Sequence, residues 1–330
     1  MAGRAGSCWK SASWTGCSSA AAESTLTCEA LVLAGPTACG KSELAIEIAQ
    51  CCRGQIISVD SCAVYRGMDI GSAKPDPGQR AAIVHHLLDV REPNQRYSAG
   101  DFAHDAVVAA AEIRRANQLP ILCGGTMLYM RTLLEGLSPI PKVPEQLRKK
   151  AIELVDEIGA PAAYRRLVQI DPQLAGRLAP TDRQRIARAL AVYEATGQPL
   201  SIWQQQRAKP PLDLKLQFVA LIPSDRDALR MRIRQRTENM FAAGFVDEVR
   251  ELAGRYGFDA EALKAVGYRQ VCQHLRGNCN LEEARRKVYE ATCQLARRQM
   301  TWLRRLAPRS QLVVDPLAGK TAKMIVRMID

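Results

Sequence analysis

The sequence has no apolar run that approaches the length of a membrane-spanning helix. The closest candidate, Ala106 to Ala111, is short and rich in alanine, whereas a spanning helix needs about 20 apolar residues. Histidine is scarce, with 4 in 330 residues, and no two of the 11 cysteines have CxxC spacing. We therefore expect no membrane insertion and no zinc site, and we interpret the cysteines as buried or incidental thiols in a reducing compartment.

Acidic residues are too few to balance the basic ones. Lys and Arg total 46 against 34 Asp and Glu, which gives a formal net charge of +12 at pH 7. Clustered guanidinium groups are the usual signature of phosphate-backbone binding. The charge therefore indicates a polyanionic partner, because a phosphorylated small molecule needs far fewer cations.

The first 27 residues lack both early acidic residues and an apolar core of the secretory type. Met1 to Thr27 is rich in Ser, Ala and Gly, and its first acidic residue is Glu23. An organelle-targeting segment is one alternative, although its basic residues are few. We favour a flexible N-terminal extension over residues 1–29, or a start placed too far upstream.

One motif organises the rest of the chain. A short apolar run from Leu31 to Ala34 precedes a glycine-bounded turn, and a helical pattern follows it. Backbone N–H groups in such a turn converge on an anion at the positive end of the helix. The turn consists of Gly35, Pro36, Thr37, Ala38, Cys39, Gly40, Lys41 and Ser42. Lys41 would supply a positive charge for a terminal phosphate, and Ser42 would supply a hydroxyl ligand for Mg²⁺. The alternative interpretation is a glycine turn that binds no ligand.

Polar residues follow two further apolar runs. Asp60 ends the run that starts at Gln55, and Gly124, Gly125 and Thr126 end the run that starts at Leu119. The carboxyl ends of parallel strands meet at one edge of a sheet, so these residues should face the phosphate loop. Thr126 could instead be a plain helix N-cap. The loop after Asp60 should contain no helix, because Pro75 and Pro77 interrupt it.

The alternation of strands and helices predicts an α/β fold with a P-loop NTPase-like parallel sheet flanked by helices. The core should comprise residues 30–137 and 209–330. Residues 138–208 contain only helical patterns and should form an all-helical insertion. Within it, Ile186 should face inward, while Arg185 and Arg188 lie on another face, which by default is a solvated one.

Two C-terminal segments combine cations with aromatic residues. The segment from Leu263 to Arg269 should be a turn that exposes Tyr268. On a long helix from Leu281 to Leu306, Arg297, Thr301 and either Arg304 or Arg305 share one side, and Arg298 and Trp302 lie beside them. Arginine with an interleaved aromatic on one helix suits a nucleic-acid surface.

Several long segments resemble one family, the tRNA dimethylallyltransferases, also called tRNA isopentenyltransferases. The resemblance runs from Leu31 to about Leu306. The segments are Gly35 to Ser42, Ile57 to Pro75, Gly124 to Tyr129, Ala265 to Gln270 and Arg297 to Arg304. A general nucleotide kinase would share only the first.

The resemblance implies transfer of a dimethylallyl group from dimethylallyl diphosphate to the N6 amine of the adenosine immediately 3′ of the anticodon in tRNA. Asp60 matches the catalytic aspartate, acting as general base or orienter, and Thr126 matches the catalytic threonine. The diphosphate would lie in the loop with Mg²⁺ held through Ser42, and Arg236 aligns with a distal diphosphate contact. The base must leave its stack to react.

The resemblance also implies which residues contact the anticodon stem-loop. They are Asp60, Ser61, Cys62, Ala63, Thr126, Arg148, Gln184, Arg185, Ile186, Ala187, Arg188, Lys264, Ala265, Val266, Gly267, Tyr268, Arg269, Arg297, Arg298, Gln299, Thr301, Trp302 and Arg304.

The sequence departs from the family pattern at three positions. Cys39 replaces a common serine, Ser72 a threonine and Thr181 an asparagine. The C-terminal zinc finger of the eukaryotic relatives is absent, so we expect a cytoplasmic, bacterial-type, monomeric enzyme. Two alternatives remain open from the residues alone: a P-loop small-molecule or nucleotide kinase, and a noncatalytic RNA-binding ATPase.

Overall fold

The computed structural model describes residues 28–206, 209–306, 312–317 and 321–329. Nearly all of the predicted N-terminal extension therefore lies outside the described residues. No helix within these ranges is both long and apolar enough to cross a membrane.

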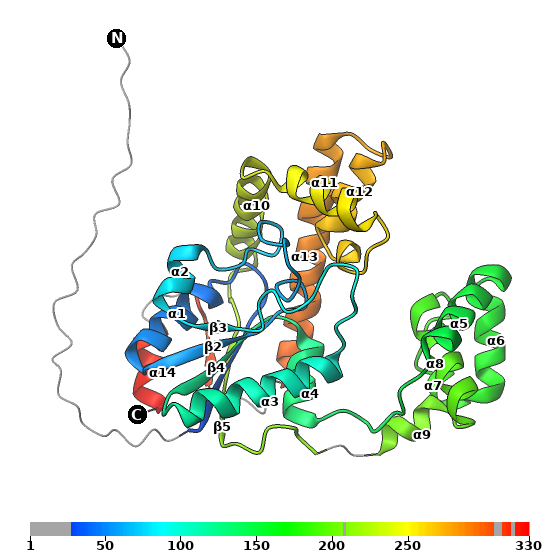
Figure 1. The fold of residues 1–330 in the computed structure, drawn as a ribbon, viewed down its shortest axis with the longest axis horizontal. Coiled ribbons are helices and arrows are strands. Elements are labelled where there is room, and N and C mark those ends of the chain that lie inside the picture. The colour runs from blue at the N-terminus through cyan, green and yellow to red at the C-terminus, as the bar shows by residue number, and fades with distance from the viewer. Residues whose placement is uncertain (1–27, 207–208, 307–311, 318–320, 330) are drawn as a thin grey trace, which may run out of the picture.

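A parallel sheet forms the centre of the fold, as predicted (Figure 1). Among the described residues it has six strands in the order β3-β2-β4-β1-β5-β6, and every neighbouring pair is parallel. The strands are β1 (Ala30–Ala34), β2 (Gly54–Val59), β3 (His85–His86), β4 (Leu119–Gly124), β5 (Leu216–Leu221) and β6 (Leu312–Val314). The central strand β1 is buried on both faces, which is why it reads as a continuous apolar run.

The helices outside the insertion are α1 (Lys41–Cys51), α2 (Pro77–Ala82), α3 (Ala99–Arg115), α4 (Met127–Glu135), α10 (Arg226–Ala242), α11 (Phe245–Tyr256), the short 3-10 helix η1 (Ala262–Lys264), α12 (Tyr268–Leu275), α13 (Leu281–Leu306) and α14 (Thr321–Ile329). Helices flank both faces of the sheet, whereas α11 and α12 lie around the part of α13 that extends away from it (Figure 1). Leu31 and Leu33 of β1 pack with α1 and α14, whereas the alternate residue Val32 packs with α3. The period-two alternation of a strand thus divides the core into two layers.

The helical insertion comprises α5 (Glu145–Ile158), α6 (Ala160–Ile170), α7 (Pro172–Ala175), α8 (Arg183–Thr196) and α9 (Leu200–Gln205). It has a hydrophobic cluster of its own and lies to one side of the sheet (Figure 1). Buried Asp171 connects α7 and α9, because its two carboxylate oxygens accept the backbone N–H groups of Leu174 at 2.9 Å and Ser201 at 2.8 Å.

Two local expectations were wrong. Pro77 does not prevent a helix but begins one, because Asp76 and Gln79 form a capping box around it and proline fits the first helical turn. Tyr268 is not exposed on a turn: it starts α12, and its side chain is fully buried.

Candidate active site

The phosphate loop joins β1 to α1, at the carboxyl edge of the sheet. Ala38 and Gly40 have φ values of 62° and 89°, which turn successive backbone N–H groups inward in the manner of an anion nest. The Lys41 ammonium folds back over the loop and donates to the Pro36 carbonyl at 3.5 Å. The loop thus has the backbone geometry and the positive charge that a phosphate group needs.

Asp60 lies directly after β2, where the strand leaves the sheet. Its Oδ1 atom accepts the backbone N–H groups of Cys62 at 2.7 Å and Ala63 at 3.3 Å. These contacts fix the orientation of the carboxylate. No described residue donates to its Oδ2 atom, and Asp60 lines the same cavity as Lys41 and Ser42.

Thr126 connects the ends of β2 and β4. Its Oγ1 atom accepts the N–H of Ser61 at 3.0 Å, and its own N–H donates to the Val59 carbonyl at 3.2 Å. Although Thr126 occupies the N-cap position of α4, its side chain makes no capping hydrogen bond. Gly124 allows this close approach, since a Cβ atom there would lie 2.1 Å from the Val59 oxygen. The threonine hydroxyl is therefore held beside Asp60 rather than used for capping.

Gln299 on α13 bridges the phosphate loop and the glycine turn. Its Nε2 atom donates to the Gly125 carbonyl at 2.8 Å, and its Oε1 atom accepts the N–H of Thr37 at 2.9 Å. The residue is buried, so its side chain connects elements of the site instead of facing solvent. The sequence placed Gln299 among the tRNA contacts and gave no signal for this bridge, because its two partners are more than 170 residues away.

Arg236 on α10 approaches the cavity from the opposite wall. Its guanidinium Nη2 donates to the Ser72 carbonyl at 3.3 Å, and it lines the cavity together with Asp60 and Ser42. Burial lowers the pKa of Arg236, while the nearby Asp60 carboxylate raises it. An arginine starts from so high a pKa that it stays protonated, which leaves a desolvated positive charge facing the phosphate loop.

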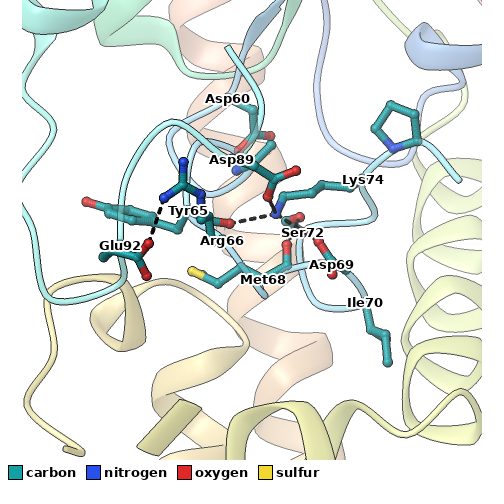
Figure 2. Close-up of polar contacts among 12 residues, drawn as sticks. Asp60, Tyr65, Arg66, Met68, Asp69, Ile70, Ser72, Lys74, Asp89 and Glu92 are labelled. Carbon is teal, nitrogen blue, oxygen red and sulfur yellow. Dashed lines mark hydrogen bonds and ion pairs between the residues drawn. The ribbon is translucent and has the colours of Figure 1, made fainter. Parts of the chain in front are cut away.

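The loop after Asp60 is held by a buried lysine (Figure 2). Lys74 has a side chain that is 1% exposed, and its ammonium donates to the Tyr65 carbonyl at 2.6 Å, to Asp69 at 2.8 Å and to Asp89 at 2.6 Å. Burial raises the pKa of Asp89, but hydrogen bonds from Lys74 and Arg80 outweigh burial and lower it overall. Sequence reasoning named Lys74 only as part of a motif and did not foresee this structural role.

The cavity between these walls has a volume of about 400 Å³, within the range of small-molecule sites. The phosphate loop, Asp60, Thr126, Arg236 and Trp302 all contribute to its lining. Of the residues predicted to be catalytic or to bind diphosphate, Thr37, Lys41, Ser42, Asp60, Thr126 and Arg236 line this cavity, whereas Gly35, Pro36, Ala38, Cys39 and Gly40 do not. Two conditions for group transfer are met, because an anion cradle and a carboxylate face the same volume.

Thiols around the cavity are poorly suited to nucleophilic chemistry. Burial raises the pKa of Cys123 to about 12, and it raises the pKa values of Cys62 and Cys39 as well. The reactive thiolate form is therefore scarce at neutral pH. Asp60 and Thr126 are among the polar residues that line the cavity.

The predicted tRNA-contacting residues divide by exposure. Ala63, Ile186, Ala187, Tyr268 and Gln299 are buried, so their side chains pack in the interior of this structure. Exposed side chains belong to Ser61, Gln184, Arg185, Arg188, Lys264, Arg269, Arg297, Arg298, Thr301 and Arg304. Partly exposed are Cys62, Thr126, Arg148, Ala265, Val266 and Trp302, whereas Gly267 is buried. The exposed arginines of α13 adjoin the cavity, because Arg298 and Trp302 also line it.

A metal site built from protein side chains alone is not evident in the described part of the chain, where no three His, Cys, Asp or Glu residues gather. Ser42 offers a hydroxyl at the cavity wall, next to the Lys41 position. This donor set fits Mg²⁺, which commonly takes one or two protein oxygens and completes its shell with phosphate and water.

A parallel sheet with a phosphate loop at its carboxyl edge, facing a fixed carboxylate, defines an enzyme of the P-loop class that binds a phosphorylated substrate. The model of the IPP transferase family matches residues 63–306. The chain belongs to this family.

Relatives match over most of their length. A tRNA dimethylallyltransferase of Xanthomonas campestris is 47% identical over 282 residues, which cover 83% of this chain and 86% of the relative. One of Thiobacillus denitrificans is 46% identical over 302 residues, covering 90% and 96%.

Solved structures agree with the fold. The full-length tRNA isopentenylpyrophosphate transferase of Bacillus halodurans has a TM-score of 0.63 at 32% identity, with 91% of this chain and 94% of that chain covered. A eukaryotic dimethylallyltransferase acting on tRNA has a TM-score of 0.76 at 24% identity, covering 90% and 77%, and supports the fold alone.

Proposed function

We propose that this chain transfers the dimethylallyl group from dimethylallyl diphosphate to the N6 amine of the adenosine immediately 3′ of the anticodon in tRNA. The products are N6-isopentenyladenosine and diphosphate. One observation carries the proposal: the phosphate loop, the Asp60 carboxylate and the Arg236 guanidinium line a single cavity. The names of the relatives support the same substrate class.

The loop and two cations would hold the leaving group. Backbone N–H groups of the loop and the Lys41 ammonium bind the diphosphate, and Arg236 binds its distal phosphate. The allylic carbon–oxygen bond breaks as the bond from N6 to that carbon forms. Negative charge that develops on the departing oxygens is stabilised by donors already in place, which require little reorganisation.

Asp60 and Thr126 would act on the amine. The Oδ2 atom of Asp60, which no described residue occupies, accepts a hydrogen bond from N6 and either takes its proton or orients its lone pair toward the carbon. Oδ1 already accepts the N–H groups of Cys62 and Ala63, so Oδ2 is the oxygen available to a substrate in the cavity that Asp60 lines. The Thr126 hydroxyl accepts the N–H of Ser61, the residue after Asp60, and donates to the Ser61 hydroxyl at 3.3 Å; on substrate binding it would turn its proton to the same base.

Mg²⁺ would be held by the Ser42 hydroxyl together with diphosphate oxygens and water. When bound, the ion neutralises charge on the leaving group. Ser42 lies in the first turn of α1, where the helix N-terminus also favours an anionic group.

The anticodon stem-loop would bind across the exposed arginines of α13 and the insertion. Arg297, Arg298 and Arg304 face solvent beside the cavity mouth, where they can contact backbone phosphates. The target adenosine leaves its stack to enter the cavity. We also propose that the protein acts as a monomer, since a single chain supplies every wall of the cavity.

A transfer assay tests the function. Anticodon stem-loop RNA is incubated with dimethylallyl diphosphate, Mg²⁺ and the protein, and its nucleosides are analysed by mass spectrometry. Isopentenylated adenosine is expected. Unmodified RNA at saturating substrates would contradict the proposal, and transfer of the γ-phosphate of ATP to a small molecule would favour a kinase instead.

A further inference from the structure

Glu248 on α11 lies outside the cavity and nevertheless organises one of its walls. Its Oε2 atom accepts the backbone N–H groups of Asp69 at 2.9 Å and Ile70 at 2.6 Å. Its Oε1 atom accepts the N–H of Gly71 at 3.1 Å and the hydroxyl of Tyr268 at 2.7 Å. One carboxylate thus receives three consecutive backbone amides and a phenol, an arrangement in which charge-assisted hydrogen bonds are strong.

The same turn is pressed against an aromatic pair. Phe245 and Tyr268 pack edge to face with their centroids 5.0 Å apart. A Cβ atom at Gly71 would lie 2.2 Å from Phe245 and 2.5 Å from Tyr268, so only glycine permits this approach. Packing and hydrogen bonding therefore fix the turn from the same side.

The fixed turn leads directly to the diphosphate-binding wall. The residue after Gly71 is Ser72, whose carbonyl accepts the Arg236 guanidinium at 3.3 Å. Figure 2 shows Asp69, Ile70 and Ser72 in this loop beside the buried Lys74. Both Gly71 and Ser72 line the cavity, whereas Glu248 does not. A continuous path of contacts therefore joins Glu248 to Arg236.

We propose that Glu248 is a positioning residue for the diphosphate: it fixes the turn of residues 69–71 and, through the Ser72 carbonyl, orients the Arg236 guanidinium. The inference rests on the proposed function for the placement of the diphosphate beside Arg236. A carboxylate is required because four donors converge on two acceptor oxygens. Glutamine would keep one oxygen and turn an NH₂ group toward an N–H donor, which leaves donors unpaired.

Binding of inorganic diphosphate tests the inference without the transfer reaction. Titration calorimetry with Mg²⁺ and inorganic diphosphate compares the full-length protein with Glu248→Gln and with Glu251→Gln. Glu251 is a matched control, since it lies on the same helix with an exposed side chain. Glu248→Gln should weaken diphosphate binding by about tenfold, and Glu251→Gln should leave it within about twofold.

Steady-state kinetics separate positioning from general loss of structure. Glu248→Gln should raise KM for dimethylallyl diphosphate by about tenfold and leave KM for stem-loop RNA nearly unchanged. In a double-mutant cycle with Arg236→Ala, the second change should add little to the first, because both act on one contact. If Glu248→Gln does not fold, Glu248→Asp, which keeps the charge but is one methylene shorter, should show the same selective loss.

Three outcomes would overturn the inference. They are unchanged diphosphate binding in the Glu248 variant, an equal rise in both KM values, and full additivity with Arg236→Ala. A wild-type protein that binds inorganic diphosphate but transfers no prenyl group would refute the proposed function and leave this inference standing. If the protein transfers the prenyl group but the Glu248 variant binds diphosphate normally, the proposed function stands and this inference is refuted.

Discussion

Gln299 accepts a hydrogen bond from the N–H of Thr37 at 2.9 Å, although 262 residues separate them in the chain. The bond places the long helix α13 against the phosphate loop. Because α13 also carries exposed arginines, the helix that would hold RNA is hydrogen-bonded to the loop that would hold diphosphate. The position of one bound substrate would therefore be fixed relative to the position of the other.

Gln299→Ala should lower both stability and turnover. The change leaves the Thr37 N–H and the Gly125 carbonyl without their side-chain partner, which costs about 2 kcal/mol. Urea unfolding measures the loss of stability, and the transfer assay measures turnover. Gln294→Ala, at an exposed position of the same helix, is the control and should have little effect. Equal effects of the two changes would argue against the bridge.

Asp60→Asn should reduce turnover by about 10² or more and leave tRNA affinity nearly unchanged. Asparagine retains an Oδ1 acceptor for the N–H groups of Cys62 and Ala63, so the local fold should persist. Single-turnover rates and filter binding of stem-loop RNA provide the two measurements. A tRNA affinity that falls as far as the rate would exclude the catalytic role.

Lys41→Ala should weaken use of the diphosphate substrate. The ammonium is the charged group that folds over the phosphate loop, and RNA does not need it there. KM for dimethylallyl diphosphate should therefore rise by about tenfold or more, while RNA affinity measured by filter binding stays close to that of wild type. A selective loss of RNA affinity would contradict this role.

Arg297→Ala should weaken tRNA binding and make it less dependent on salt. Loss of one phosphate contact lowers the slope of log affinity against log salt concentration by about 1. Filter binding between about 50 and 200 mM salt measures that slope. Arg115→Ala is the control, because Arg115 is exposed at the end of α3, just before β4 begins at the opposite edge of the sheet. An unchanged slope in the Arg297 variant would place the RNA elsewhere.

The ion pairs of Asp89 should stabilise the fold in a pH-dependent way. The pKa of Asp89 is lower in the folded protein than its ordinary value, so its contribution is complete above about pH 4 and is lost as the pH falls through the folded pKa. The difference in urea midpoint between wild type and Asp89→Asn should be large at pH 7 and shrink at about pH 3. Asp259→Asn, at an almost fully exposed position, is the control. A difference independent of pH would rule out this linkage.

The sequence predicted those parts of the fold in which local pattern and tertiary packing agree. The helix predicted from Leu281 to Leu306 is α13, which has the same limits in the structure. The run before the phosphate loop became a buried central strand. In each case an uninterrupted apolar period was long enough to indicate both the type of element and its limits.

Other elements escaped prediction because their signals were short or conflicting. Helix α2 was not predicted because Pro75 and Pro77 were interpreted as helix breakers, although Asp76 and Gln79 form a capping box. The strand β6 was not predicted because three residues carry little pattern, and the amphipathic helix α14 was overlooked. Tyr268 was taken for an exposed aromatic because its flanking cations suggested a surface.

The sequence predicted which motifs form the candidate site, but it did not predict the contacts between distant residues that hold these motifs in place. Phosphate loop, Asp60 and Thr126 each follow a strand, so topology alone placed them at one edge of the sheet. Glu248 and Gln299 bind backbone groups far away in sequence. No local pattern distinguishes such a side chain from a solvated one, and only the folded arrangement reveals it.

The insertion of α5 to α9 has a hydrophobic cluster that shares no residue with the clusters of the sheet. Substitutions on the surface of the insertion should therefore leave the packing around the phosphate loop unchanged. Each part of the chain can therefore be altered by mutation without repacking the core of the other.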